Sequence, residues 1–390
     1  MISVDDALAR LRALVPLMDI EEVSLIEATG RVLAQPVAAR RDQPPFAASA
    51  MDGYAVCAQD AAAGAVLDVI GESAAGSRFD APCTPGKAVR IFTGAPVPEG
   101  AAHVVIQENV TREGDRITIT APGDGANIRP AGGDFRIGDE LSAPRLLTPA
   151  DVALLAAMNI DRVPVRRRPV VALIATGDEL VQPGETPGPD QIIASNCYGL
   201  HGLLSATGAE PRMLPIAPDE LDQLIATFEL AQDADLVVSV GGASVGDHDL
   251  VGKAAAALGM EQAFYKVAMR PGKPLMAGQI KDVPLIGLPG NPVSAMVCGE
   301  VFLRPVIATM LGLEHSFATR RLPLTAPMEA NGPRQHFMRA KAGPEGVTPF
   351  PSQDSALLTV LSASNVLIVR PPHAPEAAKG DEVDVIDIGH

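Results

Sequence analysis

Between residues 169 and 298, short apolar runs alternate with segments of helical periodicity, and no other feature restricts the possible fold as strongly. The apolar runs are PVVALIATG, RMLPIAPD, DLVVSVGG and VPLIGLPG, and the helical segments include SNCYGLHGLLSATG and DELDQLIATFELAQ. Strands that are almost continuously apolar and alternate with helices are typical of a parallel sheet covered on both faces. We therefore predict a central doubly wound parallel-sheet domain over residues 167–316.

The segments that flank this domain predict β structure. Residues 42–139 contain the short runs AVRIFTGAPV, HVVIQENV and RITIT between Gly and Pro turns, which favours a β-rich module. Residues 317–390 return to short β segments and predict a small C-terminal β domain. The whole chain is therefore expected to be a multidomain α/β plus β protein.

A helical linker domain is predicted from the two segments around the β-rich module, residues 1–41 and 140–166. One helix is expected to begin at Ser3, which can cap it, and another at Thr148-Pro149. Both helices have apolar stripes, and we expect them to pack on each other. The β-rich module would then be inserted between the two halves of one helical element.

Composition and charge exclude several classes of protein. The 390 residues carry a formal net charge of −16, whereas a nucleic-acid partner requires a basic face. Aromatic residues make up 3% of the chain and Trp is absent, so no stacking platform for bases is expected. The sequence predicts neither a secretory signal nor a membrane span. Four dispersed cysteines argue against a disulfide framework or structural zinc and favour a cytoplasmic location.

Polar turns follow three of the predicted strands, where ligands bind in open parallel sheets. They are Thr176–Glu179, Gly241–Asp249 and Leu288–Ser294. In the third turn, Asn291 is expected to cap the following helix with Pro292 at its first position. Free N–H groups at that helix N-terminus would suit a phosphate. We expect the three turns to converge on one site.

The turn that contains the glycines Gly241 and Gly242 also contains acidic residues, which would repel a phosphate. A divalent cation held by Asp249 or Glu179 resolves the conflict, because it would bridge carboxylate and phosphate. Between the second and third turns, Lys266, Arg270 and Lys273 place three cations within eight positions, a pattern that suits an oxyanion.

Each of these signals also has an ordinary structural explanation. A Gly-rich turn is often only a tight connection, and Glu179, Arg270 and Lys273 taken singly are typical surface charges. His248 has no second histidine at metal-ligand spacing, and Cys298 lies on an apolar segment that is typical of a core. The prediction of a site depends on several signals at one edge of one domain.

Seven motifs occur in the order seen in one known family: SAMDGYAV, FTGAPVPEG, the segment from Arg129 to Asp134, TGDEL, GGASVGDHD, KVAMRPGKP and LPGNPVS. The chain resembles the MoeA-type molybdopterin molybdenumtransferases, to which the gephyrin E domain also belongs. The resemblance implies an elongated homodimer of four-domain subunits, with a MogA-like central domain and a small C-terminal β-barrel. It implies insertion of molybdate into adenylylated molybdopterin, with Mg²⁺ assisting and AMP released. Contacts with other proteins of molybdenum cofactor biosynthesis are a further expectation.

The resemblance also implies roles for individual residues. Catalytic roles fall on Asp52, Glu179, Asp249, Lys266 and Lys273, with Glu179 and Asp249 as the metal ligands. The strand-end argument and the resemblance together give a substrate-binding set: Thr93, Arg129, Asp134, Asp219, Gly242, Ser244, Arg270, Pro289, Asn291, Ser294, Arg339 and Ser355. Those of the β-rich module would face the central domain of the partner subunit. Arg270 departs from the family pattern, which commonly has Lys there, so it suits oxyanion binding better than proton donation.

Three alternative functions stay open from sequence. An adenylyltransferase that makes the adenylylated pterin would share the central domain, but such chains resemble that domain alone. A non-catalytic molybdopterin-binding scaffold need not keep the charged site residues, most of which are present here. A paralogue that prefers tungstate is not distinguishable from the molybdate enzyme, because the two oxyanions have nearly the same size and charge.

Overall fold

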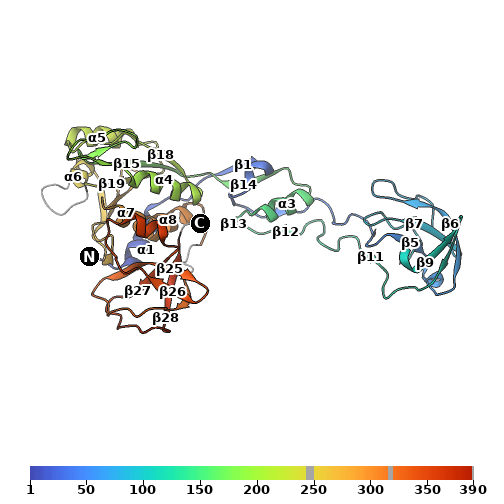
Figure 1. Cartoon of the computed structure of the whole chain (residues 1–390). Helices are drawn as coiled ribbons and strands as arrows, with labels where there is room; N and C mark the ends of the chain where they lie inside the picture. Colours follow the sequence, from blue (N-terminus) through green and yellow to red (C-terminus); the bar gives the residue numbers. More distant parts are fainter. Residues whose placement is uncertain (243–249, 315–318, 389–390) are drawn as a thin grey trace.

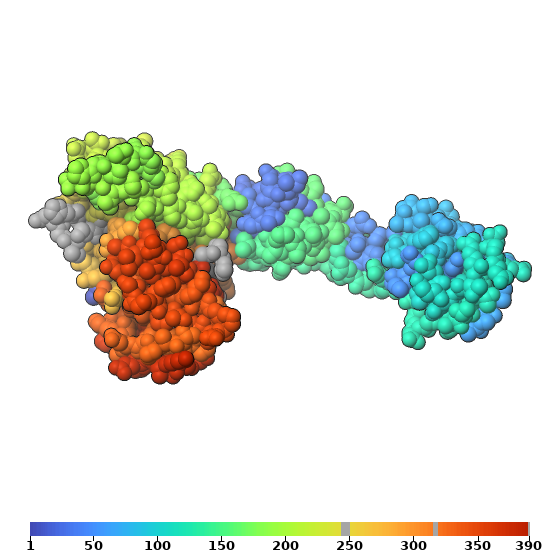
Figure 2. Space-filling model, in the orientation of Figure 1, coloured from blue at the N-terminus to red at the C-terminus, as the bar shows by residue number. Residues whose placement is uncertain are grey.

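The computed structural model describes residues 1–242, 250–314 and 319–388. The molecule is elongated, with an α/β domain and a small β domain side by side at one end and a separate β-rich module at the other (Figure 1). A narrow linker of short strands and helices joins them. Figure 2 shows that the linker and the β-rich module extend away from the larger end. Two chain segments therefore cross the linker, one in each direction.

The central domain contains a six-stranded sheet in the order β18-β15-β19-β23-β22-β20. Its strands are β18 (Glu210–Met213), β15 (Val170–Ala175), β19 (Leu236–Val240), β23 (Val283–Leu288), β22 (Met276–Ile280) and β20 (Glu261–Tyr265). The first four are parallel, and β22 and β20 add an antiparallel edge. The predicted parallel sheet is thus confirmed for the strands whose ends were expected to carry the site.

Helices cover both faces of this sheet, as predicted. They are α4 (Asn196–Ala206), α5 (Leu221–Glu229), α6 (Leu250–Ala257), α7 (Pro292–Cys298), the π-helical turn η3 (Gly299–Leu303) and α8 (Arg304–Met310). Helices α5 and α6 pack over one face, and α4, α7 and α8 pack over the other in a separate core. The continuous helical stretch Pro292–Met310 is long and apolar enough to cross a membrane, but 78% of its apolar window is buried inside the protein. It is therefore built as a core helix.

The prediction that the two linker helices pack on each other is wrong. Helix α1 (Val4–Leu14) packs against α8, and its apolar stripe of Val4, Ala7, Leu8 and Leu11 is buried in the central core. Helix α3 (Pro149–Ala157) instead packs against α2 (Leu25–Ala28) in a core of its own. Because the stripe of α1 is already covered by α8, it leaves no apolar face for α3.

The linker consists mainly of strands rather than helices. It contains the sheet β1-β14-β2-β13 and the pair β3-β12. These strands are β1 (Ile20–Ser24), β14 (Arg162–Arg166), β2 (Val32–Leu33), β13 (Arg145–Leu146), β3 (Val37–Ala38) and β12 (Glu140–Leu141). The chain leaves through β3 and returns through β12, which pair in antiparallel fashion. The β-rich module is therefore an insertion into the linker.

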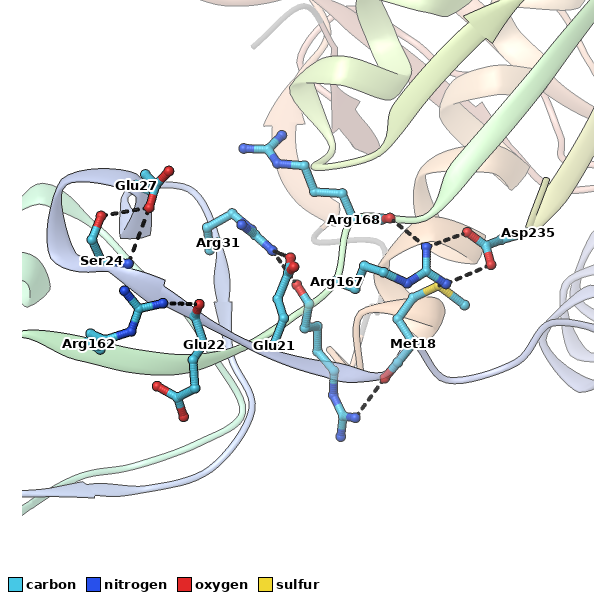
Figure 3. A network of polar contacts seen from close by, with 11 residues as sticks. Met18, Glu21, Glu22, Ser24, Glu27, Arg31, Arg162, Arg167, Arg168 and Asp235 are labelled. Atoms are coloured by element: carbon cyan, nitrogen blue, oxygen red, sulfur yellow. Dashed lines mark hydrogen bonds and ion pairs between the residues drawn. The ribbon is translucent and has the colours of Figure 1, made fainter. Parts of the chain in front are cut away.

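Arginines fix the joint between the linker and the central domain (Figure 3). The guanidinium of Arg167 donates two hydrogen bonds of 2.8 Å to the carboxylate of Asp235, which precedes β19. The same carboxylate accepts the backbone N–H of Val170 at 2.7 Å, so it ties the joint to the first residue of β15. Arg166 donates to the carbonyl of Met18 at 2.8 Å. Bidentate arginine–carboxylate pairs are geometrically specific, so the joint has a defined orientation.

The β-rich module has the sheet order β8-β5-β7-β6-β10-β9. Its strands are β5 (Gly53–Val56), β6 (Val66–Ser73), β7 (Lys87–Ile91), β8 (His103–Ile106), β9 (Val110–Glu113) and β10 (Arg116–Ile119). A separate pair, β4 (Ala48–Ser49) with β11 (Ile128–Arg129), lies where the module meets the linker. The first residue of β5, Gly53, has to be glycine, because a Cβ there would come 2.0 Å from the carbonyl oxygen of Val105.

The C-terminal domain is a small barrel, as expected from the resemblance. Its sheet runs β21-β25-β27-β28-β24, and β26 pairs with β25. The strands are β21 (Met269–Arg270), β24 (Thr319–Pro323), β25 (Gln335–Gly343), β26 (Gly346–Pro349), β27 (Val366–Arg370) and β28 (Glu382–Asp387). A bridge between Leu324 and Val347 brings the two ends of the sheet together. Strand β21 comes from the central domain, so the cationic segment is shared between the two domains.

Candidate active site

The turns after β15, β19 and β23 surround one cavity of about 430 Å³. The predicted residues that line it are Glu179, Asp219, Gly242, Pro289 and Asn291. Two short strands, β16 (Leu180–Val181) and β17 (Ile192–Ile193), form one wall. The cavity thus lies at the carboxyl ends of the parallel strands, at the edge where the sequence predicts a site.

Glycines let the three strand ends approach one another closely. Gly241 has a φ of +97°, and a Cβ at that position would come 2.7 Å from the carbonyl oxygen of Thr176. A Cβ at Gly290 would meet the Cα of Gly241 at 3.5 Å. The positive φ and the 2.7 Å contact require glycine at position 241 whether or not a ligand binds, whereas 3.5 Å is an ordinary van der Waals distance. Tight packing therefore explains Gly241, and both Gly241 and Gly242 line the cavity.

Two carboxylates line the described part of this cavity. The side chain of Glu179 folds back over Gly177, where a Cβ would come 2.3 Å from Glu179 Oε2. Asp219 also lines the cavity, and its backbone N–H donates to Asp178 Oδ1 at 2.9 Å. Within residues 1–242, 250–314 and 319–388, no group of three or more His, Cys, Asp or Glu side chains is arranged to hold a metal.

Several predicted residues lie outside the described part of the chain. Asp249, Ser244 and His248 all belong to residues 243–249, which the structure does not describe. The prediction that Asp249 and Glu179 bind one metal is therefore untested. Cys298 is fully buried, and burial raises the pKa of its thiol well above the ordinary range, which agrees with a core position.

A second cavity, of about 360 Å³, is cationic and lies between the central domain and the barrel. Arg270, Lys273, Ser294 and Ser355, all predicted as site residues, line it together with Arg334. Both cavities share Pro274 in their walls, so they adjoin each other. An acidic cavity and a cationic cavity therefore meet at the loop that follows β21.

Asn291 occupies the N-cap of α7, but its side chain makes no capping hydrogen bond, so that part of the prediction is wrong. The amide instead turns outward and donates to Ser355 Oγ at 3.2 Å. The carbonyl of Ser355 accepts the N–H of Val293 at 3.1 Å and satisfies one donor of the helix N-terminus. The C-terminal domain thus covers the start of α7 and joins the two cavities through Asn291.

Arg339 does not line either cavity, although it was predicted as a substrate-binding residue. Its side chain is fully buried, and Nη1 donates to the carbonyl of Asp354 at 2.8 Å, directly behind the cationic cavity. Nε and Nη2 are buried and have no hydrogen-bond partner among the residues that the structure describes. Burial lowers the pKa of this guanidinium, and Arg270 adds to the effect while Asp354 opposes it. Buried donors without partners are uncommon and mark a position suited to an acceptor.

Two residues of this region were missed from sequence, Arg334 and His336. Arg334 lines the cationic cavity, and its Nη1 donates to the carbonyl of Met269 at 3.4 Å. His336 pairs with Arg270 across β21 and β25 and is buried. Burial lowers its pKa to about 4, with further lowering from the nearby arginines, of which Arg270 contributes most. The run PRQHFMRA carries His and two Arg within six residues and could have signalled this cluster.

Lys266 lies apart from both cavities, since it appears in the wall of neither. Its Nζ lies 4.8 Å from the ring centroid of Tyr265, a cation–π contact. The backbone of Lys266 has a φ of +69°, a left-handed conformation that is uncommon for a residue other than glycine.

The remaining predicted residues lie at the far end of the molecule. In the β-rich module, Asp52 Oδ1 accepts the N–H and the hydroxyl of Thr93, each at 2.7 Å. These two hydrogen bonds lower the pKa of the Asp52 carboxyl. Arg129 and Asp134 line a third cavity, of about 790 Å³, between the module and the linker. A single chain therefore does not bring this group to the strand-end cavity (Figure 1).

Comparison with known proteins places the chain in a class that this geometry fits. Residues 2–159 match the model of the MoeA N-terminal region (domain I and II), residues 172–309 that of a probable molybdopterin binding domain, and residues 321–388 that of the MoeA C-terminal region (domain IV). The three matches cover the linker with its inserted module, the central domain and the barrel. The chain belongs to the MoeA family.

Similar proteins of known name and structure agree with this assignment. The molybdopterin molybdenumtransferase of Nostoc sp. is 36% identical, with 95% of this chain and 89% of that protein covered. That of Haemophilus influenzae is 34% identical, with 100% of this chain and 99% of that protein covered. The crystal structure of the molybdopterin biosynthesis moeA protein of Pyrococcus horikoshii superposes with a TM-score of 0.86 at 30% identity, with both chains fully covered.

Proposed function

We propose that this protein is a molybdopterin molybdenumtransferase, which inserts molybdate into adenylylated molybdopterin and releases AMP. The observation that carries the proposal is the pair of adjoining cavities, one acidic and one cationic, that share Pro274. The reaction would use both cavities. The pyrophosphate of the substrate suits an acidic cavity that holds a metal ion, and molybdate, the second oxyanion, suits a cationic cavity. The names of the similar proteins support the same activity.

The acidic cavity suits a divalent cation such as Mg²⁺. Glu179 and Asp219 supply carboxylate oxygens, the ligands that this cation prefers, and Asp249 is proposed as a further ligand. A bound cation would supply the charge that lets these carboxylates coexist with a pyrophosphate. Gly242 and Asn291 line the same cavity and are proposed to contact the phosphates through backbone and amide groups.

The cationic cavity is proposed to hold molybdate next to the pyrophosphate. Arg270 and Lys273 would hold the oxyanion, and the hydroxyls of Ser294 and Ser355 would donate hydrogen bonds to it. Arg339 has two buried donors just behind this cavity, so a small shift of the Asp354 segment would bring them to the anion. Arg270 serves here as an oxyanion ligand rather than as a proton donor, because a guanidinium stays protonated.

A homodimer is proposed because a single chain leaves its site residues in two distant groups. Asp52, Thr93, Arg129 and Asp134 lie across the linker from the cavities, on the inserted module. In a dimer of elongated subunits, the module of a second copy would lie against the central domain and complete the site. A cytoplasmic location and transient contacts with other proteins of molybdenum cofactor biosynthesis are part of the same proposal.

The test is release of AMP from adenylylated molybdopterin by the purified protein, at fixed Mg²⁺, with and without molybdate. Release that depends on molybdate would establish the transferase. Binding of the substrate without molybdate-dependent release would instead favour a non-catalytic scaffold. Parallel assays with tungstate distinguish a tungstate-preferring paralogue, which would turn over at lower tungstate than molybdate concentrations. Loss of Mg²⁺ should abolish release if a cation bridges Glu179 and the pyrophosphate.

A further inference from the structure

The cationic loop, which we define as Lys266–Pro274, is held on two sides by distant parts of the chain. On one side, Gln335 of the barrel donates its N–H to the carbonyl of Ala268 at 2.9 Å, and β21 pairs with β25. On the other side, Ile2 forms a parallel bridge with Val267. The loop that carries Arg270 and Lys273 is therefore the middle chain of a small three-chain ladder.

The contact with Ile2 consists of two backbone hydrogen bonds. The N–H of Ile2 donates to the carbonyl of Lys266 at 3.2 Å, and the N–H of Ala268 donates to the carbonyl of Ile2 at 2.8 Å. Val267 lies between these two bonds, and Lys266, whose carbonyl accepts the first of them, has a left-handed backbone conformation. Such a conformation is costly for lysine and persists only where surrounding contacts determine it. The two bonds to Ile2 supply such contacts.

Ile2 is well placed to act as a fixed support, because it is continuous with α1. The hydroxyl of Ser3 caps this helix by accepting the N–H of Asp6 at 3.0 Å. Val4 is 2% exposed and belongs to the central core. Farther along α1, Arg10 donates to the carbonyl of Ala263 in β20 at 2.8 Å. The helix is thus anchored both to the core and to the strand that leads into the cationic loop.

The support reaches the cavity through one more set of bonds. Val267 donates its N–H to the carbonyl of Lys273 at 3.1 Å, and Lys266 donates to the carbonyl of Leu275 at 2.9 Å. The segment paired with Ile2 is therefore bonded directly to the residue whose side chain lines the cationic cavity. A change at Ile2 would reach Lys273 through two successive backbone contacts.

We propose that Ile2 is a positioning residue for the oxyanion cavity: its backbone pairing with Lys266 and Ala268 holds the cationic loop in the shape that presents Lys273 and Arg270. The identity of the anion as molybdate rests on the proposed function. The pairing itself is independent of the reaction. Ile2 lines neither cavity, so it acts only through the loop.

The test compares Ile2→Pro with Val4→Ala. Proline removes the N–H that bonds to Lys266, whereas Val4→Ala loosens the packing of α1 and leaves the pairing in place. We expect Ile2→Pro to raise the KM for molybdate about tenfold, which corresponds to roughly the loss of one strong contact, with kcat changed less than about twofold. Val4→Ala should lower the melting temperature and leave the KM unchanged. Equal KM values in wild type and a folded Ile2→Pro would overturn the proposal.

Amide hydrogen exchange separates this proposal from the proposed function. Ile2→Pro should speed exchange in the peptide that covers Lys266–Lys273 by tenfold or more, whereas Val4→Ala should speed it mainly within α1. Unchanged exchange in the cationic loop would refute the positioning role even if the enzyme is active. Faster loop exchange without any molybdate-dependent AMP release in wild type would refute the proposed function alone. If Ile2→Pro fails to fold, Ala268→Pro removes the other bond of the pair and has the same expected outcomes.

Discussion

At the scale of single residues, His336 is the group whose charge the structure controls most clearly. It is buried beside four arginines, and burial followed by the charge of Arg270 lowers its pKa from an ordinary 6.5 to about 4. The imidazole is therefore neutral in the folded protein at neutral pH. A positive charge at this place would add to a cluster that already contains four guanidinium groups.

The depressed pKa of His336 predicts a specific loss of stability in mild acid. Between pH 6.5 and 4 the unfolded chain binds a proton at this histidine and the folded chain does not, so the free energy of unfolding falls as pH falls. The full effect is at most about 3 kcal/mol. Urea unfolding of wild type and His336→Gln at pH 7 and pH 5 measures it. The variant should lose less stability over this interval; equal losses would show that His336 is not the group responsible.

At the scale of elements, the joint between linker and central domain includes a bidentate ion pair between Arg167 and Asp235. Burial opposes the ionised form of Asp235, but hydrogen bonds from Arg167 and Val170 outweigh it and lower the pKa of the carboxyl. The pair is about one-third exposed on the arginine side, so solvent weakens it. Its larger effect is geometric, because it fixes the direction in which the linker leaves the central domain.

Substitution of Asp235 should therefore affect the joint more than the cores. We expect Asp235→Ala to lower the free energy of unfolding by roughly 1–3 kcal/mol, because Arg167 and the Val170 N–H lose their acceptor. Arg212→Ala breaks the more exposed pair with Asp233 and is the matched control, with an expected loss below about 1 kcal/mol. Chemical denaturation measures both losses, and small-angle scattering should detect a broader range of shapes for Asp235→Ala alone. Similar scattering for the two variants would contradict the role of the joint.

What sequence predicted at this scale was local, and what it missed was the choice of packing partner. The alternation of strand and helix predicted the sheet, because buried parallel strands must be apolar along their whole length. The apolar stripe of α1 predicted a helix but not its packing partner, because any apolar surface can cover such a stripe. In the structure, α8 covers it. Asn291 was placed correctly at the start of α7, yet its amide bonds to Ser355, which lies far along the chain.

The candidate site divides in the same way. Glu179 and Asn291 were predictable together because strand ends in a parallel sheet must share an edge, whereas Asp219, which lines the same cavity, was predicted only from the family resemblance. Arg334 and His336 were not, because they lie on a barrel strand whose position against β21 depends on the packing of two domains. Lys266 was expected near the anion, but it lines neither cavity. Its left-handed backbone conformation was not predictable from any sequence pattern.

At the scale of the whole molecule, the elongated shape separates two groups of proposed site residues, so a test of the site is also a test of the proposed homodimer. If each site combines Glu179 of one copy with Asp52 of another, then Glu179→Ala and Asp52→Ala should each abolish AMP release as separate homodimers. Mixing the two variants under conditions that exchange subunits should restore part of the activity. In a mixed dimer, one of the two sites combines an intact central domain with an intact module, which amounts to at most a quarter of all sites. Both side chains are exposed or half-exposed, so the variants should fold normally.

The size of the recovery decides between shared and self-contained sites. With random exchange, half of the dimers are mixed and each contains one intact site, so activity should reach about one quarter of wild type, as the two-fold symmetry of a homodimer requires. A mixture that stays inactive while native mass spectrometry shows mixed dimers would mean that Asp52 and Glu179 serve the same chain. The linker would then have to bend far enough to bring the β-rich module back to its own central domain, which the arginine joint at Asp235 opposes.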